Sequence, residues 1–437
     1  MKSYPETVKD TLYSLIHDIS KHAWLYTANP ARDFTRNRKL SFEKMLAILV
    51  GMGGHTMRDE LMDYFGCTPN MATVPAFVQR RSKIMPEVLE FLFHQFTDAC
   101  AKPSFYKGFR LLAVDGSALQ FTANPSDKES YYPGTNGQLH YSLLHLNAIY
   151  DLLSRTYLDA VIQKRRVQNE NKALVQMVDR SCIADPVILL ADRGYESYNN
   201  LAHMERKGWN YLIRLRDSHG IMDSYSFPKE DEFDIPVHII LTRKQTNTVK
   251  QMIKKNPELY RYVSSKQPFD FLDLHDNLFY PLDFRIVRFS LPNGSFETVI
   301  TNLDANGFPP EELRQLYFRR WGIETAFRQL KHTIALSNFQ SKKVEHIFQE
   351  IFARLIMYNF TELITSHVII QRNHRKYTYQ ANFSAAVHIC RQFLRGAVSP
   401  PNVEALIARF ITPIRPGRNE PRKLKPNTFK GFLYRIA

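Results

Sequence analysis

Two aspartates follow apolar runs at positions where an α/β sheet commonly places its chemistry. Asp115 follows LLAV in the motif VDGS, and Asp192 follows VILLA in the motif ADRGY. Carboxylate oxygens are the ligands that hard divalent cations prefer, and ligands gather outside the carboxyl ends of parallel strands. Asp115 taken alone is better explained as part of an Asp-Gly turn. If the two strands are adjacent and parallel, however, the two carboxylates lie close enough to share metal ions.

A third carboxylate lies on a helix with an uncommon combination of side chains. The segment YFRRWGIETAFRQLK carries Tyr317, Arg320, Glu324 and Lys331. At about 100° per residue these four side chains fall within one arc of about 60°. An apolar stripe lies alongside, so the helix is expected to pack on the sheet and to show Glu324 beside it. Simple ion pairs on an exposed helix are the alternative, at roughly a few tenths of a kcal/mol each. Such pairs do not explain why a phenol and a lysine share that face.

The order of secondary structure predicts how these residues are positioned. Strands are expected at 110–114, 142–151 and 156–163, followed by a helix at 170–182, a strand at 187–191, a helix at 197–207 and a strand at 211–215. Three strands, helix, strand, helix, strand is the order of a ribonuclease H-like α/β fold, in which a mixed sheet has helices on both faces. Asp115 and Asp192 then end two central strands of that sheet.

The remaining segments predict an inserted β-rich subdomain and flanking helical regions. Residues 217–305 are β-rich, and from Pro309 the chain is helical again, with helices expected at 311–332, 344–370 and 382–394. The domains expected are 1–103, helical and DNA-binding; 104–216, the first part of the catalytic domain; 217–305, the β-rich insertion; 306–372, the second part with the Glu324 helix; and 373–437, a helical region with a basic tail.

The N-terminal region contains a pattern typical of DNA-binding helices. Segments 40–50 and 55–65 form a helix-turn-helix-like pair around GMGG, and a third helix is expected at 73–85. This third helix carries Gln79 and the basic residues Arg80, Arg81 and Lys83. Basic and amide side chains on one short helix suit phosphate contacts and base-edge reading. A solvated basic face on a helical bundle is the alternative interpretation.

The charge of the whole chain fits a polyanionic partner. Among 437 residues, 58 are lysine or arginine and 43 are acidic, which gives a net charge of +15. An enzyme of small molecules has no need of that excess, whereas neutralising phosphates releases counterions and favours binding. A merely basic soluble protein explains the charge about equally well. The basic tail from Arg415 onward, interleaved with prolines, is typical of extended nucleic-acid contacts, with solubility as the alternative.

Other features exclude several classes of protein. The four cysteines are far apart without a CxxC pair, which predicts buried reduced thiols in a reducing compartment. The first residues lack a signal-peptide pattern, and the apolar stretch 351–370 contains Arg354, Asn359 and Glu362, so it predicts a buried helix. A cytoplasmic protein without membrane contact is therefore expected. HExxH, GxGxxG, Walker and GxSxG motifs are absent from the sequence.

The chemistry-bearing residues resemble those of a known family. The spacing Tyr-x2-Arg-x3-Glu-x6-Lys over residues 317–331 matches the signature of the insertion-sequence-family-four DDE transposases without a gap. VDGS and ADRGY resemble the first and second aspartate motifs of that family. The similarity extends from DFTR at residues 33–36 to the RPGR and RKLK runs near the end. The long interval between Asp192 and Glu324 also fits, because members of the family carry a β-rich insertion there.

This resemblance implies a metal-dependent enzyme that cuts and joins DNA. Asp115, Asp192 and Glu324 would be the catalytic residues and would bind two Mg²⁺ ions, with Mn²⁺ as a substitute. The same site would serve hydrolysis at the end of the element and strand transfer into target DNA, with the nucleophile changed. The partners implied are the terminal inverted repeats, the target DNA and a second copy of the chain in a homodimer assembled on DNA.

Further DNA contacts are implied by the same resemblance. Tyr317, Arg320 and Lys331 would grip phosphates beside the scissile bond, a task that suits the charge of Arg and Lys. Arg193 and Arg214 are weaker candidates, for which a structural ion pair is an equally good interpretation. Some relatives form a DNA hairpin with a flipped base stacked on an aromatic residue. The insertion contains no tryptophan to take that role, so the hairpin step stays open.

Two other functions remain as alternatives. A different ribonuclease H-like nuclease, such as a resolvase, would keep the three acidic residues and need no strand transfer. A catalytically silent relative would bind DNA as a regulator or inhibitor. The presence of all three acidic residues counts against the silent protein, because a pure binding protein needs no metal ligands.

Overall fold

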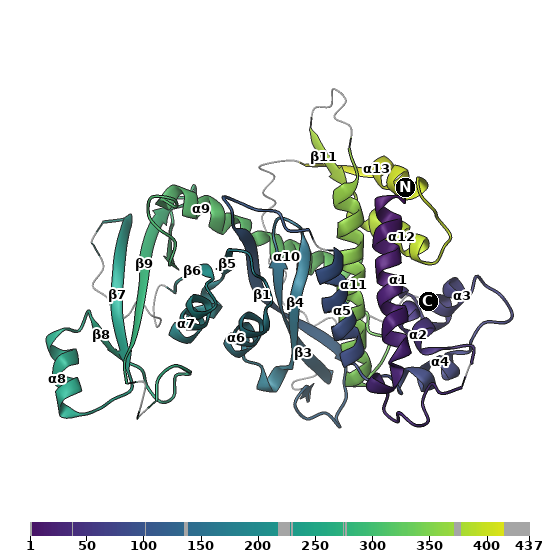
Figure 1. Cartoon of the computed structure of the whole chain (residues 1–437), viewed down its shortest axis with the longest axis horizontal. Coiled ribbons are helices and arrows are strands. Elements are labelled where there is room, and N and C mark those ends of the chain that lie inside the picture. Colours follow the sequence, from purple (N-terminus) through teal and green to yellow (C-terminus); the bar gives the residue numbers. More distant parts are fainter. Residues whose placement is uncertain are drawn as a thin grey trace.

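A long mixed sheet lies between layers of helices (Figure 1). The computed structural model describes residues 2–36, 38–100, 102–134, 139–216, 228, 230–273, 275, 278–370 and 377–414. Its strands are β1 (Arg110–Thr122), β2 (Tyr131–Tyr132), β3 (Tyr141–Asp151), β4 (Thr156–Lys164), β5 (Val187–Ala191), β6 (Asn210–Arg214), β7 (Phe233–Thr242), β8 (Tyr260–Tyr262), β9 (Tyr280–Ser290), β10 (Phe296–Thr301), β11 (Thr378–Ala381) and β12 (Ile411–Ile414).

Some of the helices flank this sheet, and the others form a separate layer at one end of the molecule. They are α1 (Tyr4–Lys21), α2 (Phe42–Gly51), α3 (Met57–Tyr64), α4 (Val74–Arg81), α5 (Glu87–Cys100), α6 (Glu170–Arg180), α7 (Tyr198–Arg206), α8 (Asn247–Lys255), α9 (Pro310–Arg319), α10 (Trp321–Arg328), α11 (Val344–His367), α12 (Phe383–Leu394) and α13 (Asn402–Arg409).

The central strands have the order that the sequence predicted. β1 pairs antiparallel with β3 and parallel with β5, β5 pairs parallel with β6, and β4 pairs antiparallel with β3. The resulting order, β4-β3-β1-β5-β6, is that of a ribonuclease H-like sheet, so the predicted fold class is confirmed. Apolar runs such as VILLA are buried on both faces, as parallel strands covered by helices require.

The first strand is longer than the sequence pattern indicated. The apolar run ends at Val114, but β1 continues to Thr122 because β3 pairs with it as far as Tyr141. Asp115 therefore lies within a strand, and the interpretation of this residue as part of an Asp-Gly turn is wrong. On the other side of β1, the parallel pairing with β5 ends at Val114 and Ala191.

The β-rich insertion extends the same sheet. β10 pairs antiparallel with β6, β9 with β10 and β7 with β9, while β8 adds in parallel to β7. The insertion is β-rich as predicted, and its strands are continuous with those that carry the two aspartates. It also contains α8, which the sequence pattern did not indicate. In Figure 1 these elements form the end of the molecule opposite the helical layer.

The two faces of the sheet belong to two hydrophobic cores. Alternate residues of β1, such as Leu112 and Val114, pack with apolar residues of α6 and α7. Their neighbours Leu111 and Ala113 belong to the other core, which includes residues of α9, α10 and α11. This alternation follows from the period of two along a strand. It places the helix that carries Glu324 on one face of the sheet.

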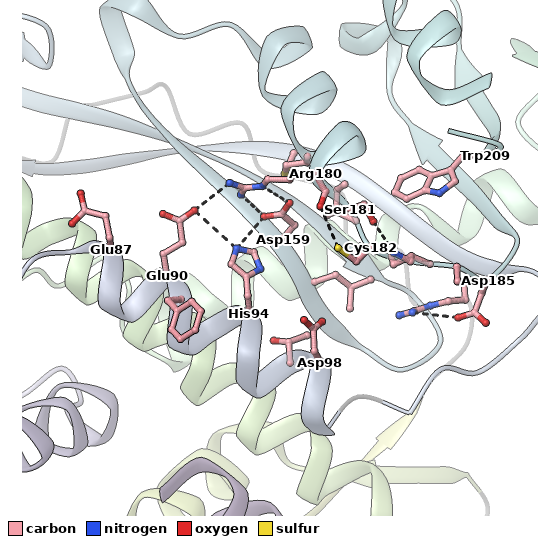
Figure 2. Close-up of a pocket in the computed structure, with 18 of the residues that line it drawn as sticks. Glu87, Glu90, His94, Asp98, Asp159, Arg180, Ser181, Cys182, Asp185 and Trp209 are labelled. Carbon is pink, nitrogen blue, oxygen red and sulfur yellow. Dashed lines mark hydrogen bonds and ion pairs between the residues drawn. The ribbon is translucent and has the colours of Figure 1, made fainter. Parts of the chain in front are cut away.

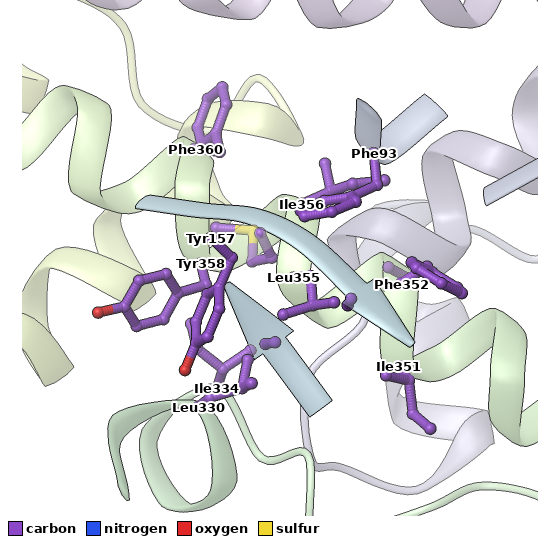
Figure 3. Close-up of a cluster of buried hydrophobic side chains, with 14 of the residues drawn as sticks. Phe93, Tyr157, Leu330, Ile334, Ile351, Phe352, Leu355, Ile356, Tyr358 and Phe360 are labelled. Atoms are coloured by element: carbon purple, nitrogen blue, oxygen red, sulfur yellow. The ribbon is translucent and has the colours of Figure 1, made fainter. Parts of the chain in front are cut away.

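The long helix α11 lies at the centre of the larger core. Figure 3 shows its side chains Ile351, Phe352, Leu355, Ile356 and Tyr358 among aromatic and aliphatic residues from several elements. Its polar residues are bonded within the protein, since Arg354 donates to the carbonyl of Gly53 and Asn359 accepts from the backbone of Tyr157. The predicted buried helix is confirmed. None of the helices in the described residues combines the length and apolar character that a bilayer crossing requires.

The N-terminal helices and the cysteines differ in detail from the predictions. α2, α3 and α4 lie at the three positions expected, and each is shorter than its predicted segment. Cys390 is buried, but Cys67 and Cys182 are exposed, so the prediction of buried thiols holds for only part of the set. All four cysteines are free. The basic tail from Arg415 onward lies outside the described residues.

Candidate active site

Asp115 and Asp192 lie side by side at the end of the β1–β5 pairing. Each is the next residue after the last pair in the parallel register, Val114 and Ala191. β1 continues as a strand, whereas the chain turns after Asp192 into a short 3-10 turn at Arg193–Tyr195. Neighbouring strands of a sheet are about 4.8 Å apart, so the two aspartates are held close by the backbone alone.

The charge state of Asp115 reflects the other acidic groups around it. Burial raises the pKa of Asp115 to about 6, and the charges of Glu324 and Asp192 act in the same direction. The backbone N–H of Gly116, at 2.8 Å from Oδ1, and the guanidinium of Arg320 oppose this increase. The three predicted acidic residues are therefore in one electrostatic neighbourhood, although Glu324 is far from the other two in sequence.

Glu324 and its neighbour Arg320 lie on an almost continuous helical segment. α9 and α10 are joined at Arg320, whose φ of −50° and ψ of −35° remain helical. The Arg320 side chain is buried, and its Nη2 donates to Glu324 Oε1 at 3.1 Å. The guanidinium also lies over the ring of Trp321, 5.0 Å from the centroid. The i,i+4 ion pair of the alternative interpretation thus forms, but its arginine is buried and lies near the aspartates.

Tyr317 connects this helix with the strand end. Its hydroxyl donates to Asp192 Oδ1 at 3.4 Å, and its side chain is buried. Burial raises the pKa of Tyr317, and the charge of Asp192 raises it further. The phenol therefore keeps its proton at neutral pH and acts as a hydrogen-bond donor.

Lys331 lies on an irregular turn that follows α10. Residues Gln329–Thr333 form a π-helical turn, a geometry often found at functional sites. From it, Lys331 Nζ donates to the carbonyl of Ala118 on β1 at 3.0 Å. Burial lowers the pKa of Lys331, while the charge of Asp115 opposes that decrease. The structure thus brings all four residues of the Tyr-Arg-Glu-Lys pattern to the two aspartates.

The carboxylate oxygens of Asp115, Asp192 and Glu324 suit a hard divalent cation. Their side chains must rearrange before they can enclose one. Within the described part of the chain, no three carboxylate, imidazole or thiol groups are close enough together to hold a metal ion. The Glu324 carboxylate is bound to Arg320 instead. The chemistry nevertheless fits, because burial and, to a lesser extent, the charges of Glu324 and Asp192 raise the pKa of Asp115, and a bound cation would stabilise its charged form.

Arg81, predicted on the third N-terminal helix as a DNA contact, is instead buried in the protein interior. It is 1% exposed, its Nη1 donates to Glu350 at 3.0 Å and its Nε donates to Gln349, both on α11. The prediction for Arg81 is therefore wrong, because this face of α4 packs against α11.

Its neighbours Arg80 and Lys83 are only partly buried. Arg80 donates to the carbonyl of Leu40 and lies over the ring of Phe34, while Lys83 pairs with Asp33 at 2.6 Å. Both still line a hollow of about 910 Å³, to which four basic residues of the preceding loop also contribute: Arg32, Arg36, Arg38 and Lys39. We call this hollow the basic groove. The sequence ARDFTRNRK contains these four basic residues within eight positions. This run of basic residues is the signal from which the basic groove could have been predicted.

The two weaker candidates for DNA contacts differ in their surroundings. Arg214 on β6 pairs with Glu297 on β10 at 3.3 Å, the structural ion pair that was the alternative for this residue. Arg193 follows Asp192 directly and its side chain is exposed. Among the tryptophans, Trp209 is buried, whereas Trp321 is 48% exposed beside Arg320.

Another pocket lies at the opposite end of the strands. Figure 2 shows Glu90 and His94 of α5 facing Arg180 at the end of α6, with Asp159 of β4 between them. The pocket has a volume of about 740 Å³ and includes Arg110, the first residue of β1, whereas the aspartates lie where the pairing of β1 and β5 ends. Its ion pairs join the helical layer to the sheet, and it is not part of the candidate site.

A ribonuclease H-like sheet with two aspartates side by side where two parallel strands stop pairing, and a glutamate on a covering helix, defines a class of metal-dependent enzymes that transfer phosphoryl groups in nucleic acids. The comparisons with known proteins agree, because residues 106–360 match the family described as "Transposase DDE domain". The chain belongs to this family and is a transposase, an enzyme that cleaves and joins DNA and depends on a divalent metal ion.

Relatives with curated names are similar over most of the chain. A transposase for insertion sequence element IS231B from Bacillus thuringiensis subsp. berliner is 22% identical, covering 78% of this chain and 77% of its own length. Transposase InsG for insertion sequence element IS4 from Escherichia coli (strain K12) is 23% identical, covering 90% and 87%. A piggyBac transposase in a synaptic complex with hairpin DNA aligns with a TM-score of 0.48 and 10% identity, over 96% and 88% of the two chains.

Proposed function

We propose that the chain is the transposase of a prokaryotic insertion sequence, which binds the terminal inverted repeats and catalyses strand cleavage and strand transfer. One observation carries the assignment of the site. Asp115 and Asp192 directly follow the last paired residues of β1 and β5. On the helical segment that bears Glu324, Tyr317 donates a hydrogen bond to Asp192 and Arg320 donates one to Glu324. A chance cluster of acidic residues does not explain a buried arginine and phenol bound to two of its carboxylates.

Asp115, Asp192 and Glu324 are proposed to hold two Mg²⁺ ions, for which Mn²⁺ can substitute. Such ions, when bound, lower the pKa of an attacking water or 3′-hydroxyl and stabilise the leaving oxygen in an in-line displacement. The backbone fixes Asp115 and Asp192, so their carboxylates need little rearrangement to bind a cation. Glu324 must leave Arg320 to join them.

Arg320 changes its partner in this proposal. In the DNA-free protein its guanidinium binds Glu324. When the DNA enters, a phosphate replaces the carboxylate on Arg320, which frees Glu324 to face the aspartates. The planar guanidinium suits both partners, since carboxylate and phosphate oxygens fit the same fork of N–H donors.

Tyr317 and Lys331 have supporting roles at the same site. The protonated phenol of Tyr317 orients the Asp192 carboxylate and can donate to a phosphate oxygen, so no covalent tyrosyl intermediate is proposed. Lys331 leaves the carbonyl of Ala118 to neutralise a phosphate next to the scissile bond. Arg193 is exposed beside Asp192 and is proposed to contact the same strand.

The basic groove and a second copy of the chain complete the assembly. Arg32, Arg36, Arg38 and Lys39 are exposed there and are proposed to contact phosphates of the terminal repeat. Two ends of an element must be brought together before strand transfer, so a homodimer assembled on DNA is proposed. The predicted domain boundaries, with residues 1–103 as the DNA-binding domain, belong to the same proposal.

The experiment is a cleavage and strand-transfer assay with the DNA ends that flank this reading frame. Purified protein is incubated with labelled end DNA, or with a scrambled duplex, in Mg²⁺, Mn²⁺, Ca²⁺ or EDTA. The proposal predicts nicked and joined products with the end DNA in Mg²⁺ and Mn²⁺ alone. Binding without cleavage in every metal would favour the silent DNA-binding regulator. Nicked products without joined products would favour a resolvase-like nuclease.

A further inference from the structure

A histidine–glutamate pair lies against the backbone that carries the two aspartates. His145 on β3 is buried, and its Nε2 is 2.9 Å from Oε1 of Glu170, the first residue of α6. Neither residue belongs to the Tyr-Arg-Glu-Lys pattern or to the two aspartate motifs. The pair therefore has no role in the site as described so far.

The position of Glu170 is between the two aspartate motifs. A Cβ placed on Gly116, which follows Asp115, would overlap His145 Nε2 and lie 3.0 Å from Glu170 Oε1. A Cβ placed on Gly194, two residues after Asp192, would lie 3.4 Å from Glu170 Oε2. Each oxygen of this carboxylate thus lies near a glycine of a different aspartate motif. The absence of a side chain at both glycines is what allows Glu170 to come so close.

His145 contacts Glu170 through its Nε2 atom. On the other side of the ring, Arg165 Nη1 lies 3.4 Å from His145 Nδ1. The interaction with His145 is the main reason that the pKa of Glu170 is lowered, and the charge of Asp192 acts in the opposite direction. Glu170 is therefore ionised at neutral pH and lies within electrostatic range of Asp192.

A buried phenol gives a second, independent indication of a ligand at this place. Tyr195 is 2% exposed, and among the described residues no group forms a hydrogen bond with its hydroxyl. After burial, the strongest influences on its ionisation are the charges of Glu170, Asp115 and Asp192. An unpartnered buried hydroxyl costs free energy. A hydrated cation between these carboxylates would supply the missing partner through a bound water.

We propose that Glu170, held by His145, is a fourth carboxylate of the metal site, next to Asp115, Asp192 and Glu324. This inference rests on the proposed function, because it assumes that the cation binds at the two aspartates. Glu170 increases the local negative charge, and its free oxygen accepts hydrogen bonds from water on the cation. Groups in this position commonly change metal affinity by roughly 10–100-fold.

The test is Mn²⁺ binding to the full-length protein, measured by the electron paramagnetic resonance signal of free Mn²⁺ without DNA. Glu170→Gln keeps the shape of the side chain and its contact with His145, and removes only the charge. It is expected to weaken Mn²⁺ binding at least roughly 10-fold. Asp179→Asn is the matched control, since Asp179 pairs with His203 at 2.9 Å near the other end of the same helix. Melting in EDTA verifies that both variants fold.

The outcomes separate this inference from the proposed function. Unchanged Mn²⁺ affinity in Glu170→Gln, together with abolished binding in Asp115→Asn and Asp192→Asn, would overturn the role of Glu170 and leave the triad intact. Unchanged affinity in all three variants would overturn the metal site itself. Equal decreases of affinity in Glu170→Gln and Asp179→Asn would show a general effect of charge and would also contradict the inference.

Discussion

At the scale of single residues, the candidate site combines a carboxylate shielded from solvent, an ion pair with a buried arginine, and a buried phenol. Asp115 is half-buried near two other carboxylates, and Glu324 is bound by a buried arginine. Tyr317 is held in its neutral form by burial. The shielding of Asp115 from solvent is unfavourable for its charged form, and a bound cation is proposed to relieve this cost. Costly residues of this kind are typical of functional sites.

The raised pKa of Asp115 predicts how the metal-free protein responds to pH. Folding raises the pKa from 3.8 to about 6, so the folded state binds the proton more tightly than the unfolded state does. The contribution of Asp115 to stability is therefore complete below pH 3.8 and disappears as the pH rises through about 6. Asp115→Asn removes this effect and should raise the melting temperature in EDTA at pH 7.5, by roughly 2–4 °C for each kcal/mol of repulsion relieved.

Added Mg²⁺ provides the control for this melting experiment. It should stabilise the wild type by mass action and have little effect on Asp115→Asn. A variant that melts below the wild type in EDTA at pH 7.5 would contradict the repulsion among the carboxylates.

Tyr317→Phe tests whether the phenol orients Asp192 or acts as a nucleophile. The variant keeps the ring and removes one hydrogen bond to Asp192, so cleavage in Mg²⁺ should slow by roughly 5-fold, since such a bond contributes about 1 kcal/mol. Single-turnover rates on end DNA measure the effect. A covalent protein–DNA product in the wild type would assign the tyrosine the role of nucleophile, and a wild-type rate in Tyr317→Phe would contradict its role in orienting Asp192.

At the scale of elements, helix α11 organises the packing of segments that are distant in sequence. Arg81 of α4 reaches Glu350 and Gln349 on it, and Arg155 next to β4 pairs with Glu362 farther along. Figure 1 shows α11 between the sheet and the N-terminal helices α1 and α2. Charged groups buried in this way must keep their partners, because a lone buried charge costs several kcal/mol.

The buried pair of Arg81 and Glu350 predicts a stability defect and not a DNA-binding defect. Arg81→Ala removes the buried ion-pair partner of Glu350 and should lower the free energy of unfolding by about 3–5 kcal/mol. Urea unfolding measures this, and DNA affinity of the folded fraction should be unchanged. Arg32→Ala, at an exposed position, is the control and should change stability by less than about 0.5 kcal/mol. A stable Arg81→Ala variant with weakened DNA binding would instead support a DNA contact for this residue.

Sequence reasoning succeeded where the signal was local and periodic. The strand VILLA was predicted with its observed bounds, and the wheel positions of Tyr317, Arg320 and Glu324 predicted the face that meets the aspartates. It failed where the result depends on a distant partner. The burial of Arg81 is determined by α11, and the length of β1 is determined by β3. Neither partner can be recognised from the residues around these positions.

The pair of His145 and Glu170 could not be predicted from the sequence for the same reason. His145 lacks the spacing of a zinc motif, and Glu170 stands at the start of an ordinary amphipathic helix. Their contact joins β3 to α6, next to Gly116 of β1 and Gly194 after β5. The glycines of VDGS and ADRGY were the available signal, because a small residue next to a carboxylate permits close approach by another group.

At the scale of the whole molecule, the net positive charge suits a DNA partner. The net charge of +15 includes the basic groove, whose residues are far from the acidic site in sequence. Phosphate contacts made by exposed lysine and arginine determine affinity through counterion release. Arg320 is buried and is proposed to act at the reacting strand. Affinity and catalysis are therefore expected to respond to different substitutions.

The basic groove can be tested through the salt dependence of DNA binding. The triple variant Arg36→Ala, Arg38→Ala, Lys39→Ala should weaken binding to end DNA and reduce the slope of log affinity against log salt by about 0.9 for each phosphate that is no longer neutralised. Three exposed lysines of α8 provide a matched control with the same change of charge, replaced in Lys250→Ala, Lys254→Ala, Lys255→Ala. Equal changes of slope in the two variants would mean that only net charge matters.

The most direct test of the central claim is the cleavage of end DNA by Glu324→Gln, measured together with its DNA affinity. Glu311→Gln is the control, because it removes a carboxylate from the exposed start of the same helical segment. Glu324→Gln is expected to bind end DNA with at least wild-type affinity, since Arg320 is released, and not to cleave it in Mg²⁺. Cleavage at the wild-type rate by Glu324→Gln would contradict the assignment of Asp115, Asp192 and Glu324 as the active site.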